Sequence, residues 1–161
     1  MAFIAGAGAT NVDLLYQGME RLPKVGEELY CKDFSLQLGG GLPATLINLA
    51  RLNVETKIAT ELGQDIFSNF AKEQFELNNV KPTNLYNGDK IPLNITSAII
   101  LPKDRTFFTY GKGSIDATDE YLEKFYEMSH GAKIVMMQLG GFLPVYRKLK
   151  EEGTILVLDT G

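Results

Sequence analysis

The fold is decided by the stretch LGGGLPATLINLARL, residues 38–52. Three glycines precede the segment Pro43–Leu52, whose apolar side chains would lie nearly all round a helix, so we predict a buried helix with a proline in its first turn. Glycine loses more conformational entropy on folding than other residues, so three in a row indicate a role beyond turning the chain. One such role is to let a ligand reach the backbone N–H groups at the start of the helix. The alternative is that the three glycines form only a flexible turn.

Short apolar strands alternate with helices on both sides of this segment. Residues Phe3–Gly8 and Thr56–Thr60 are typical of buried parallel strands. A helix capped by Asp65 follows the second of these strands. The later elements repeat the alternation as helix, strand, helix and strand over Asp119–Met128, Lys133–Leu139, Pro144–Glu152 and Thr154–Asp159. The pattern predicts an α/β fold with a mostly parallel sheet flanked by helices.

Two segments do not fit this alternation. Phe34, Leu36 and Leu38 alternate with polar residues as an exposed strand would, and Leu93–Leu101 and Thr106–Tyr110 predict a hairpin. One face of the hairpin is polar, as in a sheet that covers another part of the molecule or a ligand. We therefore predict an inserted small β-sheet built from about residues 14–38 and 93–110. No linker or repeat interrupts the chain, so residues 1–161 are expected to form one α/β domain.

Composition limits the partners that we expect. The chain has 161 residues, 45% of them hydrophobic, as in an ordinary folded domain. Its 16 Lys and Arg face 20 Asp and Glu, and the net charge of -4 argues against nucleic acid and membrane surfaces. The chain has one cysteine and one histidine, so we expect no internal disulfide and no zinc site. The first residues lack a secretory signal, which predicts a cytoplasmic protein.

Two polar side chains follow the first predicted strand. Asn11 and Asp13 are two residues apart and point the same way if the chain stays extended. An amide and a carboxylate together can bind vicinal hydroxyls, as on a sugar, whereas an Asx turn or a helix cap is the alternative. Residues Gly6–Asn11 also match the dinucleotide-binding fingerprint imperfectly. The simpler interpretation is that these small residues let the chain turn sharply as it leaves a buried strand.

Taken in order, these motifs resemble the N-terminal half of a carbohydrate kinase of the ribokinase-like (PfkB) family. The similarity runs over essentially the whole chain. It is carried by Gly8, Asn11, Asp13, Leu22-Pro23, Gly26-Glu27, residues 38–52, residues 62–67, residues 104–107 and Val157-Leu158-Asp159.

The resemblance implies a ribokinase-like fold whose inserted sheet is a lid over the substrate. The implied activity is ATP-dependent phosphorylation of a sugar hydroxyl, similar to that of fructokinases or keto-deoxy-sugar kinases. By resemblance, Asp13 and Asn11 bind substrate hydroxyls, Gly39 and Gly40 let the sugar approach the backbone, and Arg105 lies on the lid, facing the sugar. A homodimer through the lid strands is compatible with the family.

The sequence departs from the family pattern in three places. An asparagine expected after the glycines is replaced by Ala44 or Thr45, depending on register, and Gly140 replaces a glutamate of ribose-specific members. Ribose is therefore disfavoured. The family's Gly-Ala-Gly-Asp motif, with its general base, is absent, and we expect the base and the nucleotide-binding half downstream of Gly161.

The fold is thus expected to be truncated before its nucleotide-binding half. ATP and Mg²⁺ are expected for a full-length enzyme, whereas the 161-residue chain should bind neither and should be inactive alone, with no catalytic residue or metal site of its own. Two alternatives stay open. One is a non-catalytic sugar-binding or lid-dimerisation module, and the other is a small nucleotide-binding domain.

Overall fold

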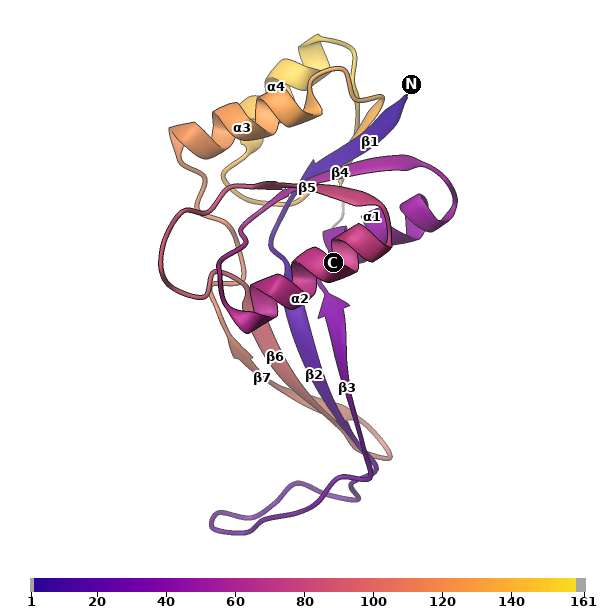
Figure 1. Ribbon diagram of the computed structural model, residues 1–161, viewed down its shortest axis with the longest axis vertical. Helices are drawn as coiled ribbons and strands as arrows, with labels where there is room; N and C mark the ends of the chain where they lie inside the picture. Colours follow the sequence, from indigo (N-terminus) through magenta and orange to yellow (C-terminus); the bar gives the residue numbers. More distant parts are fainter. Residues whose placement is uncertain (1, 159–161) are drawn as a thin grey trace.

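The computed structural model describes residues 2–158, which form a parallel sheet, a smaller sheet and four helices (Figure 1). The larger sheet has the strand order β5-β4-β1-β8-β9, and all neighbouring strands are parallel. Its strands are β1 (Phe3–Ala7), β4 (Glu55–Thr60), β5 (Val80–Asn84), β8 (Ile134–Met137) and β9 (Ile155–Leu158). This arrangement confirms the predicted α/β class. Asp159, placed by the sequence in the last strand, lies outside the described residues.

Two helices cover each face of this sheet (Figure 1). They are α1 (Gly41–Arg51) and α2 (Ile66–Leu77) on one face, and α3 (Asp119–Ser129) and α4 (Leu143–Glu151) on the other. Leu46 and Phe75 are fully buried in the first core, and Phe125 is fully buried in the second. Burying a side chain of this size contributes roughly 2 kcal/mol, so these two cores hold the sheet in place. None of the helices within residues 2–158 has the length and apolar character needed to cross a bilayer.

Helix α1 begins two residues earlier than the sequence indicates, at Gly41. Its N-cap is Gly40, whose φ of 96° lies in the left-handed region that favours glycine, and no side chain caps the helix. Helix α2 is capped as predicted, because the Asp65 carboxylate accepts hydrogen bonds from the backbone N–H groups of Phe67 and Ser68, both at 3.0 Å.

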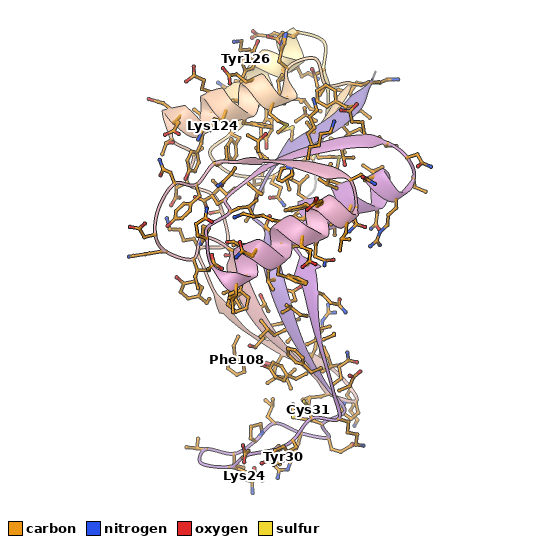
Figure 2. The ribbon with its side chains drawn as sticks, viewed as in Figure 1. Lys24, Tyr30, Cys31, Phe108, Lys124 and Tyr126 are labelled. Atoms are coloured by element: carbon orange, nitrogen blue, oxygen red, sulfur yellow. The ribbon has the colours of Figure 1, made fainter. Side chains whose placement is uncertain are left out.

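The smaller sheet confirms the predicted insertion. Its order is β3-β2-β6-β7, with β2 (Asn11–Gln17) parallel to β6 (Asn94–Ile100). The other pairs, with β3 (Asp33–Gly39) and β7 (Arg105–Tyr110), are antiparallel. We call these four strands the lid. The lid projects from the larger sheet, and the connection between β2 and β3 lies at its far end, where Figure 2 labels Lys24, Tyr30 and Cys31.

Strand β2 begins at Asn11, three residues before the predicted insertion, and this brings two candidate residues into the lid. Cross-strand register places Asn11 and Asp13 on one face, opposite Asn94 and Thr96 of β6. Asn94 and Thr96 are buried although they are polar. The polar face of the lid is therefore buried at these two positions, whereas Gln37 and Thr109 on the same face are exposed.

Candidate functional site

A cavity of about 270 Å³ lies where the lid meets α1 and the carboxyl ends of β1 and β8. Open parallel sheets commonly bind ligands at this edge. The cavity is lined by Ala9, Asn11, Gly40, Gly41, Asn94, Thr96, Thr109, Gly113 and Gln138. A neighbouring cavity of about 310 Å³ shares part of this lining, including Gln138, and extends to Gly140. We call the first of these the lid cavity.

Asp13 lies on the polar face of β2, directly opposite Thr96, which lines the lid cavity. Its carboxylate is so close to Gly39 that a Cβ atom there would overlap it. Burial raises the pKa of Asp13 above its ordinary value of 3.8. Within residues 2–158 no hydrogen bond from the protein offsets the effect of burial on this carboxylate, so its oxygens are available to ligand hydroxyls.

Asn11 stands beside Asp13 and lines the lid cavity itself. Its Oδ1 accepts a hydrogen bond of 3.0 Å from Nδ2 of Asn94. The predicted pairing of an amide with a carboxylate on one side of the chain is therefore present. Asn11 and Asp13 form part of a strand, which holds both side chains more rigidly than a turn would.

The start of α1 supplies donors to the same cavity. Gly40 and Gly41 line it, and a Cβ atom at Gly40 would lie 3.1 Å from the carbonyl oxygen of Ala9. Because no side chain caps α1, the first N–H groups of the helix are left for a ligand. The positive end of the helix dipole favours an oxygen-rich group there.

Arg105 is not part of this arrangement. It is the first residue of β7, at the far end of the lid, whereas Thr109 of the same strand lines the cavity. Its side chain is exposed, with the guanidinium 5.5 Å from the centre of the Phe107 ring. The structure therefore brings Asn11, Asp13, Gly39 and Gly40 together and leaves Arg105 apart from them.

Four polar residues that line the cavity were not proposed as site residues from the sequence, namely Asn94, Thr96, Thr109 and Gln138. Thr96 and Thr109 form a hydrogen bond of 3.1 Å between their hydroxyls across β6 and β7. The alternation in β6 indicated a polar face, but the sequence alone did not show that its even-numbered polar residues share that face with Asn11. Gln138 follows β8, and its amide lies against Gly8, where a Cβ atom would overlap it.

The glycines of residues 6–11 do not form a dinucleotide site. Strand β1 leads directly into β2, whereas the fingerprint requires a helix after its glycines. Gly6 instead lies against Leu42, whose side chain a Cβ atom would approach within 2.7 Å. Among residues 2–158, no cluster of three or more His, Cys, Asp or Glu side chains could hold a metal ion.

Neither a family model nor a curated protein matches the sequence, but solved structures do. Ribokinase from Arabidopsis thaliana, solved with ribose and ATP, is 22% identical with a TM-score of 0.75, over 100% of this chain and 54% of that one. Ribokinase from Giardia lamblia is 15% identical with a TM-score of 0.77, over 98% and 54%. A PfkB protein from Polaromonas is 14% identical with a TM-score of 0.76, over 100% and 56%.

The chain thus spans about half the length of the solved structures that it matches. Identities at this level carry information about the fold and not about the substrate. Over its whole length the chain has the fold of about half of ribokinase and of PfkB-family sugar kinases.

Proposed function

We propose that this chain carries the sugar-binding side and the lid of a carbohydrate kinase. The observation that carries the proposal is the position of Asn11 and Asp13, which β2 places beside the uncapped start of α1. A carboxylate, an amide and free backbone N–H groups together provide acceptors and donors for neighbouring hydroxyls. Polyols and sugars present such hydroxyls on adjacent carbons.

Each group has a distinct part in this proposal. The Asp13 carboxylate accepts hydrogen bonds from sugar hydroxyls, and Gly39 leaves the space in which that carboxylate lies. Gly40, with its left-handed backbone, lets the sugar reach the N–H groups of α1. The lid covers the bound sugar and excludes water, so that a sugar hydroxyl rather than water would receive a phosphoryl group.

We propose a ketose or keto-deoxy sugar acid, of the fructokinase or keto-deoxy-sugar-kinase type, as the ligand. Gly140 lines the cavity next to the lid cavity and offers no carboxylate, whereas ribose-specific relatives are expected to have a glutamate there. Calorimetric titration of the chain with D-fructose, 2-keto-3-deoxygluconate and D-ribose tests this. Saturable binding of either of the first two, stronger than that of ribose, supports the proposal, and equal or stronger binding of ribose contradicts it.

Phosphoryl transfer needs groups that we place outside this chain. ATP and Mg²⁺ would serve the complete enzyme. The general base is likewise expected downstream of Gly161. We therefore expect the purified chain to bind sugar without phosphorylating it. Release of ADP that depends on added sugar, above the rate of a D13A variant, would show that this is wrong.

The second candidate is a non-catalytic sugar-binding or lid-dimerisation module, and one observation favours it. Large apolar side chains are exposed on the lid, among them Phe34, Phe108 and Tyr110, which are 50%, 64% and 57% exposed. Cross-strand register places these three on the face opposite to Asp13, and Figure 2 shows Phe108 on the lid. Exposed apolar side chains on one face of a sheet are typical of an interface.

We propose that two copies of the chain associate through these lid residues. Sedimentation should give a dimer for the wild type and a monomer for F34S/F108S, with sugar affinity retained in both. A monomeric wild type at high concentration would rule out the association. A cytoplasmic location remains our expectation, since an ATP-dependent sugar kinase would find its nucleotide there.

A further inference from the structure

Asn94 makes a chain of hydrogen bonds that runs from the backbone to the lid cavity. It is 6% exposed, lies on β6 and uses both atoms of its amide. Its Oδ1 accepts a hydrogen bond of 3.0 Å from the backbone N–H of Gly113, and its Nδ2 donates one of 3.0 Å to Oδ1 of Asn11. Gly111, whose φ is +136° and which has no Cβ atom, lets the chain turn this close to Asn94.

The direction of this chain follows from its first member. A backbone N–H can only donate, so the atom of Asn94 facing Gly113 must be its oxygen. Its NH₂ group must then face Asn11, and the atom of Asn11 that meets a donor must be its own oxygen. The NH₂ group of Asn11 is thereby left for the lid cavity, which Asn11 lines.

We propose that Asn94 is a positioning residue that fixes Asn11 as a hydrogen-bond donor toward the sugar. This inference rests on the proposed function only for the identity of the ligand. Asn11 then offers protons and Asp13 offers lone pairs, so the two side chains recognise an oxygen acceptor next to a hydroxyl donor. A free Asn11 could present either atom, and the fixed one selects one arrangement of ligand groups.

The orientation can be measured without any sugar, from proton exchange of the side-chain NH₂ groups in the full chain labelled with ¹⁵N-asparagine. Asn69 is exposed on α2 and serves as the internal reference. We expect the NH₂ of Asn94 to exchange about tenfold more slowly than that of Asn69, because it is hydrogen-bonded and buried. The NH₂ of Asn11 should exchange at nearly the rate of Asn69. A protected Asn11 with a freely exchanging Asn94 would overturn the proposal.

The variant N94D reverses the direction while keeping the shape of the side chain. Both of its oxygens accept, so the N–H of Gly113 keeps its partner, and Asn11 must turn its NH₂ toward residue 94. Exchange of the Asn11 NH₂ should then become about tenfold slower than in the wild type. An unchanged rate in folded N94D would contradict the proposal, and the wild-type rates decide the question if N94D does not fold.

Binding of D-fructose, measured by calorimetry, separates this proposal from the proposed function. N94D and N11D should each weaken binding about tenfold, because both put an oxygen where the NH₂ group was. The control N69D should leave the affinity unchanged. The expected exchange rates without any sugar binding would overturn the proposed function alone. Sugar binding that N94D leaves unaltered would overturn the role of Asn94 alone.

Discussion

The carboxylate of Asp13 occupies the space that a side chain at Gly39 would fill. The two residues lie on neighbouring strands of the lid, β2 and β3, and share its polar face. Gly39 is therefore needed because a binding group lies over it, and not because its backbone is unusual. This relationship connects the glycine-rich stretch, which decides the fold, to the group that we expect to bind the sugar.

The substitution G39A should displace this carboxylate. A Cβ atom at residue 39 would overlap Asp13, which must then rotate away from its position. Since a hydrogen bond to a charged group contributes about 1.5–3 kcal/mol, we expect at least about a tenfold loss of sugar affinity by calorimetry. The control is G131A, which strains a left-handed glycine with open space around it, far from the lid. Equal losses in both variants would mean that G39A acts only through stability.

The stability of D13N should depend on pH in a defined direction. Burial raises the pKa of Asp13 above 3.8, so the folded chain holds this proton to a higher pH than the unfolded chain does. The free energy of unfolding then falls as pH rises through the window above 3.8, and D13N avoids this loss.

Thermal unfolding from pH 3 to pH 8 measures this effect. The Tm of D13N relative to the wild type should be highest near pH 7 and should fall as pH decreases toward 3.8. D33N, an exposed aspartate at the far end of the lid, controls for the loss of one negative charge. D13N should also lose sugar binding. A difference in Tm that rises toward low pH would contradict the buried carboxylate.

A third prediction concerns Asp65, the N-cap of α2. Burial raises the pKa of Asp65, but hydrogen bonds from Ser68 and the backbone outweigh this and lower it below 3.8. D65A should cost about 1 kcal/mol of unfolding free energy in urea at pH 7. The stability from this group should be lost as pH falls below 3.8 through the lowered pKa. D65N keeps a side-chain acceptor, so it should retain most of the stability both at pH 7 and below pH 3.8.

A fourth prediction concerns Tyr121 and Glu61, which join α3 to the end of β4. The Tyr121 hydroxyl donates a hydrogen bond of 3.1 Å to Glu61. Burial raises the pKa of Glu61, and this hydrogen bond lowers it, while burial and Glu61 raise the pKa of Tyr121 to about 12. Y121F should cost about 1 kcal/mol in urea unfolding and raise the pKa of Glu61 further.

The matched control for Y121F is Y30F. Tyr30 is 84% exposed and donates a hydrogen bond of 3.0 Å to Glu28. An exposed pair of this kind contributes little, so Y30F should change stability by less than about 0.5 kcal/mol. Similar losses in the two variants would show that burial does not strengthen the pair between Tyr121 and Glu61.

Periodicity predicted the elements whose burial is one-sided or complete, and it failed where burial is slight. Strand β5 was missed because only Val80 among its residues is buried, so the edge strand shows no apolar alternation. Asp65 was found because an N-cap is a local feature of two or three neighbouring residues. The start of β2 was misjudged because Asn11 and Asp13 are polar, and their strand exists through pairing with β3 and β6.

Strand pairing also decides which of the proposed site residues lie close together. Asn11, Asp13, Gly39 and Gly40 lie close together because the ladder between β2 and β3 aligns them, and a resemblance to sugar kinases pointed to all four. Asn94 is 83 residues from its partner Asn11, and such a contact depends on the register between β2 and β6. Arg105 was expected to face the sugar, and β7 places it at the far end of the lid from the cavity.

Calorimetric titration of the purified chain with D-fructose and 2-keto-3-deoxygluconate, with D13N in parallel, tests the central claim most directly. We predict saturable binding of at least one of the two to the wild type, without nucleotide, and at least about a tenfold weaker affinity for D13N. Failure of the folded wild type to bind either sugar, or equal affinity in D13N, would contradict the assignment of this cavity to a sugar.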